Sequence, residues 1–282
     1  MTTTTPGRLF HGLLDDAAIF PPGDAPMADA VRAHVGRWQS PQAPLLGPFI
    51  CSLPRWGELT AVLSGAPPLP LSLTLPGGAE QVAAAVAEVG AEPAVRLVAL
   101  EVAGSAETLP GLVATLHRHV PPGVSVYVEL PLADVTAPHI GTLVGAGLRL
   151  KIRTGGVVAA AYPGERELAG ALLAAVRSGA AFKLTAGLHD PVRHRDPVTG
   201  FEHHGFLNVI LATARAVEGS GADAVAEALA DQDGARVAAA VAAIDDSAAG
   251  PIRRHFISFG TCSVSEPIDG LRHHGLLPED MR

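Results

Sequence analysis

The stretch "LRLKIRTGGVVAAAYPGERELAGALLAAVRSGAAFKLTAG", residues 148–187, contains one complete strand–helix–strand repeat. Apolar and charged residues alternate over 148–153, which is the period of two residues that a strand gives. After a glycine turn, the Ala- and Leu-rich segment 164–179 has helical spacing, with acidic residues near its start and a glycine at its end. A second short strand is expected at 181–187. This order predicts two parallel strands that are joined by a helix.

The same alternation recurs along the chain after residue 40. It predicts further strands at 45–52, 69–75, 95–101, 124–130 and 255–260, and helices that include 77–90, 105–120 and 204–219. An eighth strand is expected at 17–20, followed by a Pro-rich turn and a helix over 26–38, and residues 219–247 predict two successive helices before the last strand. Eight such repeats in about 250 residues are typical of an α/β fold, the TIM-type (β/α)8 barrel, here as one domain over 1–282.

The main alternative is an open doubly wound sheet, which normally carries a glycine-rich phosphate loop after its first strand. The chain has no GxGxxG or GxxxxGK[ST] motif in such a place. The closed barrel is therefore the favoured prediction.

Composition limits the classes of partner. The chain has 282 residues, is 48% hydrophobic and 17% charged, and carries a formal net charge of −8, which argues against nucleic acid as a partner. The amino terminus lacks the order of a signal peptide, and no apolar run is long enough to span a membrane, so a cytoplasmic protein is expected. Cys51 and Cys262 lie far apart and are predicted to be free thiols.

Lysine is rare in this chain. Of 20 Lys and Arg residues, only Lys151 and Lys183 are lysines, and both lie in predicted strands. Lysine, unlike arginine, provides an amine that can lose its proton and act as a nucleophile or base. Strand alternation directs Lys151 and Arg153 to the inside of the barrel from one strand, and Lys183 and Thr185 from another.

Other polar residues share this inward row, among them Glu101, Glu129 and Ser258. Most of the charged ones lie toward the carboxyl ends of their strands, where TIM-barrel active sites are built. One interpretation is structural, with Glu129 and Lys151 forming a buried ion pair between neighbouring strands. Because burying charges is costly, the alternative interpretation is a site for a small anionic substrate.

The segment "AFKLTAG", residues 181–187, resembles the Schiff-base lysine strands of class I aldolases. Keto-deoxy-phosphogluconate aldolases carry a Phe-Lys pair on a barrel strand, and deoxyribose-phosphate aldolases carry a Lys followed closely by Thr and Gly. The resemblance covers seven residues and implies that Lys183 condenses with a carbonyl substrate. Lys151 is then expected to lower the pKa of Lys183 by like-charge repulsion. Lys151 and Arg153 are also expected to serve as the electrophilic or anion clamp, and Glu129 and Glu101 as proton-transfer or orienting acids.

Two loops are candidates for holding an anion. Gly260, Thr261 and Ser263 follow the last strand, where backbone N–H groups and hydroxyls before a short helix suit a phosphate, although a plain helix cap at Ser265 explains the same residues. Residues 153–158, "RTGGVV", form the second candidate. The charged segment 187–204 is expected to be a lid over the barrel mouth, with His189 and His204 contacting substrate or acting as acid and base.

Three functions remain open from the sequence. The first is a barrel enzyme that acts on a small phosphorylated or carboxylated carbonyl compound by lyase (aldolase-like) or isomerase chemistry, with an interior lysine and no cofactor. The second is a barrel hydrolase or enolising enzyme that uses a divalent metal held by Glu101, Glu129 or the loop histidines. The third is a non-catalytic anion-binding barrel. The role of Asp15 and Asp16, as an anchor or as part of the site, is also open, and a homo-oligomer is compatible with the sequence.

Overall fold

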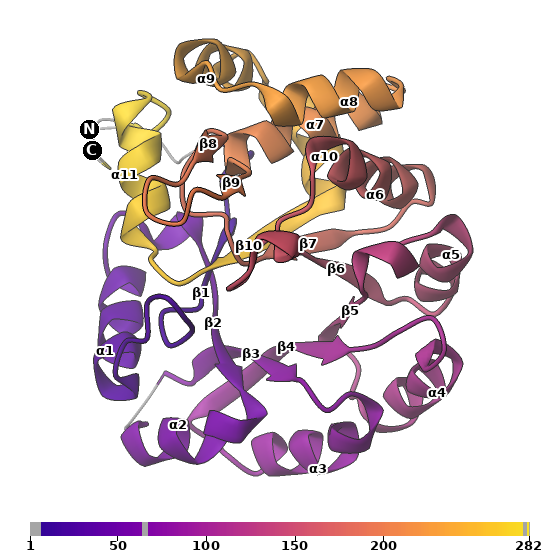
Figure 1. Cartoon of the computed structure of the whole chain (residues 1–282). Coiled ribbons are helices and arrows are strands. Elements are labelled where there is room, and N and C mark those ends of the chain that lie inside the picture. The colour runs from indigo at the N-terminus through magenta and orange to yellow at the C-terminus, as the bar shows by residue number, and fades with distance from the viewer. Residues whose placement is uncertain (1–6, 64–66, 279–280, 282) are drawn as a thin grey trace.

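The protein is described from a computed structural model over residues 7–63, 67–278 and 281, so most of the segment inspected for a signal peptide lies outside the described residues. Within these residues, eight parallel strands close into a barrel (Figure 1). The closed ring confirms the TIM-type barrel and excludes the open sheet. Going round the ring, the strands are β1 (Leu14–Asp16), β2 (Leu46–Ser52), β3 (Leu69–Leu75), β4 (Val95–Ala103), β5 (Ser125–Glu129), β6 (Arg149–Arg153), β7 (Phe182–Thr185) and β10 (Phe256–Thr261).

Helices surround the barrel, as the strand–helix alternation predicts. The described helices are α1 (Met27–Trp38), α2 (Trp56–Val62), α3 (Ala79–Gly90), α4 (Leu109–His119), α5 (Ala137–Gly145), α6 (Glu165–Arg177), α7 (Phe206–Val217), α8 (Ala222–Ala230), α9 (Gly234–Ala242), α10 (Asp246–His255) and α11 (Ser265–His273). The predicted elaboration before the last strand is present as α8 and α9. It continues into α10, so that the last strand begins at Phe256 rather than His255.

The first strand differs from the prediction. Residues 17–20 were expected to form it, but β1 is Leu14–Asp16 and residues 17–20 lie in the turn that follows. Two adjacent aspartates are unusual in a strand. They are tolerated here because Asp15 faces the barrel interior and Asp16 faces α1, and each meets partners there.

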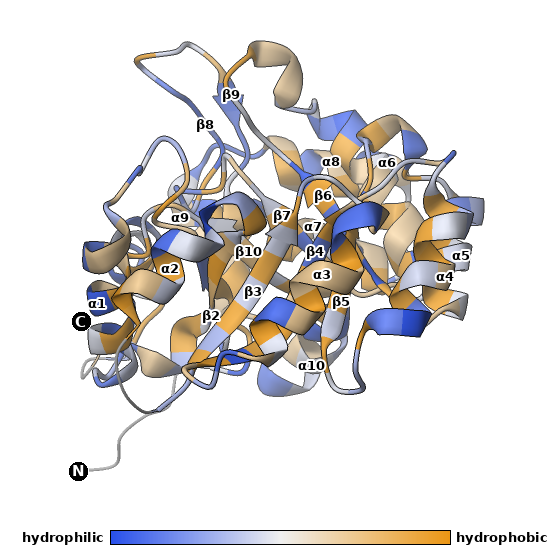
Figure 2. Ribbon diagram, turned by 90° about the horizontal axis from the view of Figure 1, so that it is seen from below, coloured by the Kyte–Doolittle hydropathy of each residue, from blue (hydrophilic) through white to orange (hydrophobic). Residues whose placement is uncertain are grey.

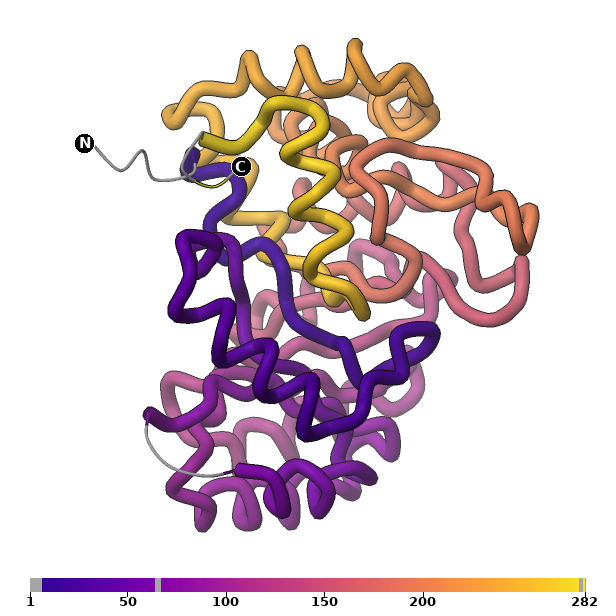
Figure 3. The backbone as a smooth tube through the Cα atoms, turned by 90° about the vertical axis from the view of Figure 1, so that its left-hand side faces the viewer, coloured from indigo at the N-terminus to yellow at the C-terminus, as the bar shows by residue number. Residues whose placement is uncertain are grey.

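The first and last strands close the ring. β1 pairs in parallel with β10, with Leu14 opposite Phe259 and Asp16 opposite Thr261. The early part of the chain and the carboxyl-terminal helix consequently lie side by side (Figure 3). Closure brings Asp15 into the same interior as residues that lie more than a hundred positions away in sequence.

Strand alternation places apolar side chains between the barrel and its helices. In β6, Leu150 and Ile152 are completely buried on the side that α5 covers, while Lys151 points inward. Burying a Leu or Ile side chain contributes about 1.5–3 kcal/mol. Figure 2 shows the hydrophobic strands within a shell of helices whose outer faces are more hydrophilic. Among the described residues, no helix combines the length and apolar character needed to cross a bilayer.

A short antiparallel hairpin, β8 (His194–Arg195) and β9 (Glu202–His203), projects from one end of the barrel (Figure 2). It lies in the segment 187–204 that was expected to form a lid. Because it follows β7, it belongs to the face at which the strands end. We call the carboxyl ends of the strands, together with this hairpin, the barrel mouth.

A buried hydrogen-bond chain fastens α1 to β1. The Trp38 indole N–H donates to Nε2 of His34 over 2.8 Å, and Nδ1 of His34 lies 3.0 Å from Oδ2 of Asp16. Since an indole can only donate, Nε2 of His34 must accept and Nδ1 carries the proton toward Asp16. Asp16 and His34 are both fully buried. Asp16 is therefore a structural anchor.

We predict that Asp16→Ala lowers the free energy of unfolding by about 2–4 kcal/mol, because it leaves the buried His34 N–H without an acceptor. Urea denaturation followed by circular dichroism measures the change. Asp29→Ala is the matched control, because Asp29 pairs with Arg32 on the exposed side of α1. Loss of the Asp29 carboxylate should change the free energy of unfolding by less than about 1 kcal/mol. Equal losses in the two variants would contradict the anchoring role.

Candidate active site

Both lysines lie inside the barrel, on neighbouring strands. Lys151 of β6 stands directly opposite Lys183 of β7 in the strand register. Their side chains are 6% and 1% exposed, respectively, so Lys151 lies slightly nearer to solvent than Lys183. The inward placement that strand alternation predicts for both amines is confirmed.

The two amines belong to a continuous line of alternating charges. From the mouth inward, Arg153 Nε lies 2.8 Å from Oε1 of Glu129, and Lys151 Nζ lies 2.8 Å from Oε2 of the same carboxylate. Lys151 Nζ also lies 2.8 Å from Oε2 of Glu101, whose Oε1 lies 2.6 Å from Lys183 Nζ. Lys183 Nζ then reaches Asp15 Oδ2 at 2.5 Å. We call this line the charge ladder, formed by Arg153, Glu129, Lys151, Glu101, Lys183 and Asp15.

Glu101 holds the two amines together. Each of its oxygens contacts a different lysine, and Oε1 also accepts the Ser72 hydroxyl over 2.6 Å. Burial alone would raise the pKa of Glu101, but the two ammonium groups outweigh it and hold the pKa well below its usual range. Glu101 is therefore an ionised carboxylate between two cations rather than a proton carrier.

The prediction that Lys151 lowers the pKa of Lys183 is wrong, because the pKa is raised. Burial would lower this pKa, but the carboxylates of Asp15 and Glu101 outweigh it and raise the pKa above its ordinary value. Like-charge repulsion from Lys151 does not dominate because the Glu101 carboxylate lies between the two amines. Lys183 is thus held as an ammonium ion.

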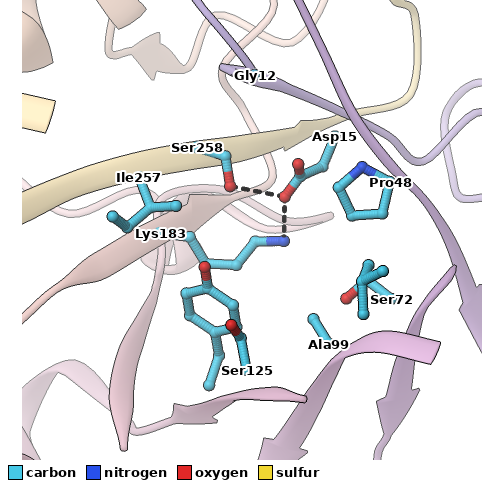
Figure 4. Close-up of a pocket in the computed structure, with 11 residues that line it drawn as sticks. Gly12, Asp15, Pro48, Ser72, Ala99, Ser125, Lys183, Ile257 and Ser258 are labelled. Carbon is cyan, nitrogen blue, oxygen red and sulfur yellow. Dashed lines mark hydrogen bonds and ion pairs between the residues drawn. The ribbon is translucent and has the colours of Figure 1, made fainter. Parts of the chain in front are cut away.

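Asp15 forms the inner end of the charge ladder. The sequence left open whether Asp15 is an anchor or part of the site, and the structure places it against Lys183. Its Oδ2 accepts from both Lys183 and the Ser258 hydroxyl, the latter over 2.7 Å (Figure 4). Its Oδ1 occupies the space of a side chain at Gly47, where a Cβ would lie 1.8 Å from that oxygen. The sequence signal was the Asp pair beside Leu14, but only ring closure shows which aspartate points inward.

Glu129 and Arg153 form the outer end, where solvent reaches the ladder. Their side chains are 21% and 51% exposed, respectively. Burial would raise the pKa of Glu129, but Lys151 and Arg153 outweigh it and lower the pKa. The ion pair between Glu129 and Lys151 that the structural interpretation expected is present. Exposure therefore rises steadily from Lys183 through Lys151 to Arg153.

The candidate substrate-binding residues at the end of the barrel divide between the last strand and the loop that follows it: Ser258, Gly260 and Thr261 belong to β10, and Ser263 lies in the loop. Ser258 contacts Asp15, and Gly260 stands opposite Thr185 in the register between β10 and β7. The Thr261 hydroxyl donates to the Ser263 carbonyl over 2.9 Å. The Ser263 hydroxyl accepts from the Glu266 N–H over 3.4 Å, whereas the expected cap, Ser265, is already the first residue of α11.

The two predicted loop histidines have different surroundings. His189 Nδ1 lies 3.1 Å from a Glu266 oxygen, and the side chain is 18% exposed. His204 is fully buried, with Nδ1 3.2 Å from an Arg193 nitrogen and Nε2 2.8 Å from the Pro163 carbonyl. Burial lowers the pKa of His204 to about 4. His204 therefore links the hairpin segment to the loop before α6.

A tyrosine that strand alternation also directs inward completes the interior. The Tyr127 hydroxyl accepts from Arg149 over 2.9 Å, and Lys183 Nζ lies 5.4 Å from the centre of its ring. In the described part of the chain, no group of three or more His, Cys, Asp or Glu side chains is arranged to hold a metal ion. Glu101 and Glu129, the acids considered as metal ligands, are both directed at Lys151.

Comparisons with known proteins do not assign this chain to a group. No family model matches the sequence, and searches of curated proteins and of solved structures found no match either.

Proposed function

We propose that this barrel is an enzyme that acts on a small phosphorylated or carboxylated carbonyl compound by lyase or isomerase chemistry, with Lys151 as the reacting amine. The observation that carries the proposal is the position of Lys151, which lies between a deep carboxylate, Glu101, and a carboxylate at the mouth, Glu129. A ligand that enters from the mouth meets Arg153 and Glu129 first and Lys151 next. Lys183 is less accessible, and its two carboxylate partners keep it protonated.

The outer groups are suited to an anionic carbonyl compound. Arg153 uses Nε to hold Glu129, and half of its side chain remains exposed at the mouth, where the guanidinium can accept a carboxylate or phosphate. Gly155 and Gly156 follow Arg153 by two and three residues, and we expect their N–H groups to add donors for the same anion. Arg153 is therefore the anion-binding residue in this proposal.

The proposed chemistry follows from the two carboxylates that contact Lys151, those of Glu101 and Glu129. One ammonium proton of Lys151 passes through Glu129 to the carbonyl oxygen of the substrate, and the free amine adds to the carbonyl carbon. A second proton from the nitrogen joins the same oxygen, which leaves as water, so that a protonated imine links Lys151 to the substrate. The imine draws electrons from an adjacent C–C or C–H bond, and Glu129 accepts or returns the proton at the reacting carbon. Glu101 and Lys183 act as positioning residues, since they fix Lys151 from the inner side.

We predict that sodium borohydride traps a substrate adduct on Lys151. The protein is incubated with pyruvate, glyceraldehyde 3-phosphate or dihydroxyacetone phosphate, reduced, digested and mapped by mass spectrometry. With only two lysines in the sequence, the assignment is direct. Lys151→Met should abolish the adduct. An adduct on Lys183 alone would contradict the assignment of Lys151 and would make Lys183 the reacting amine. If none of these compounds gives an adduct on either lysine, amine catalysis is contradicted.

We also predict that Arg153→Met weakens the binding of an anionic carbonyl compound by at least about tenfold, the cost of one charge-assisted interaction. Isothermal titration calorimetry with pyruvate measures the dissociation constant. Arg166→Met is the matched control, because Arg166 pairs with Asp223 on the outer surface. Unchanged affinity in Arg153→Met would contradict anion binding at the mouth.

A further inference from the structure

A cavity of about 200 Å³ lies inside the barrel at the inner end of the charge ladder (Figure 4). Lys183, Asp15 and Ser258 line it on one side, where the ladder ends. Its other lining residues come largely from the amino-terminal parts of the strands, among them Ser125, the first residue of β5, and Ile257, the second residue of β10. The cavity therefore extends away from the mouth, toward the opposite face of the barrel.

Small inward side chains create this space. TIM barrels are normally filled here by layers of bulky apolar residues. In this chain Ser72 stands opposite Ala99, and Ala99 stands opposite Ser125, along three neighbouring strands. A register shift in β4 near Val98 adds an extra residue to the wall.

The lining changes from buried to partly exposed along the cavity. The residues near the ladder are buried, with Lys183 1% and Asp15 3% exposed. The residues toward the amino-terminal face are partly exposed, and these are Gly12, Pro48, Val98, Ser125 and Ile257. This gradient indicates that the cavity opens to solvent at the amino-terminal face.

The inner lining has hydrogen-bonding capacity left for water. Lys183 has three N–H donors, and its described carboxylate partners, Asp15 and Glu101, take two of them. The Tyr127 hydroxyl accepts from Arg149, which leaves its own proton to donate. The cavity has room for about six water molecules, and cavities with polar walls of this kind are hydrated whereas purely apolar ones stay dry.

We propose that this cavity is a water-filled inlet through which the Lys183–Asp15 pair exchanges protons with solvent at the amino-terminal face, opposite the mouth. Solvent then reaches the charge ladder from both ends, at Arg153 from the mouth and at Lys183 from the inlet. The Arg149 guanidinium lies over the Tyr127 ring beside this route, and Arg253, near the end of α10, donates to the carbonyls of His11 and Phe256. The inlet does not depend on the proposed reaction, since proton exchange at an amine requires no turnover.

The test measures hydrogen exchange of the lysine ammonium groups by nuclear magnetic resonance. Because the sequence has two lysines, protein labelled with ¹⁵N-lysine gives two side-chain ammonium signals, which Lys151→Arg assigns. Ser125→Leu fills the inlet, and the exchange rate of Lys183 should fall by at least about tenfold because solvent access is lost. Val98→Ala widens the inlet, and the same rate should remain unchanged or rise. Lys151 serves as an internal control, because it does not line the cavity and its rate should change less than about twofold in either variant.

Three results would overturn the inlet. One is a Lys183 exchange rate in Ser125→Leu within about twofold of the original protein. Another is equal slowing of Lys151 and Lys183, which would indicate a general change in the barrel. The third is a high-resolution crystal structure with no ordered solvent in the cavity. If Ser125→Leu does not fold, the smaller Ser125→Val replaces it with the same expected direction.

Discussion

Charges inside a protein are stable only when opposite charges and hydrogen bonds compensate them, and in this barrel that compensation depends on Glu101. Its two oxygens neutralise two lysines on neighbouring strands, at a depth where Glu101 is itself buried. Removing Glu101 would leave two ammonium groups facing each other across one register position. The line from Arg153 to Asp15 therefore behaves as a single unit, in which the charge state of each member depends on its neighbours.

This dependence gives the two lysines different electrostatic surroundings although their sequence surroundings are similar. Lys183 is enclosed by Glu101 and Asp15 and is held as an ammonium ion. Lys151 shares Glu101 but has as its second partner Glu129, which solvent reaches at the mouth. In the proposed reaction, Glu129 can therefore relay a proton from Lys151 at a position that solvent reaches. The aldolase-like motif around Lys183 therefore does not by itself show which lysine would react in the proposed function.

The barrel also differs from a uniformly packed one. Serines and an alanine replace bulky residues along one side of the interior, so that the space below Lys183 is open rather than filled. If the cavity is hydrated as we propose, the ion-paired middle and the exposed outer end would permit proton movement along the barrel axis. Stability in such an arrangement comes from the helix-facing side of the strands and from anchors outside the barrel, such as Asp16 with His34 and Trp38.

The amino-acid sequence by itself determined the repeated strand–helix units, the closed-barrel class and the inward direction of Lys151, Lys183, Glu101 and Glu129, because each follows from a local period of two or 3.6 residues. Only the tertiary structure decided that β1 begins at Leu14, that Asp15 pairs with Lys183, and that the pKa of Lys183 is raised rather than lowered. Asp15 and Lys183 lie 168 residues apart in sequence. Their contact depends on ring closure and strand register, and the charge state of a buried group is set by such distant partners rather than by its neighbours in sequence.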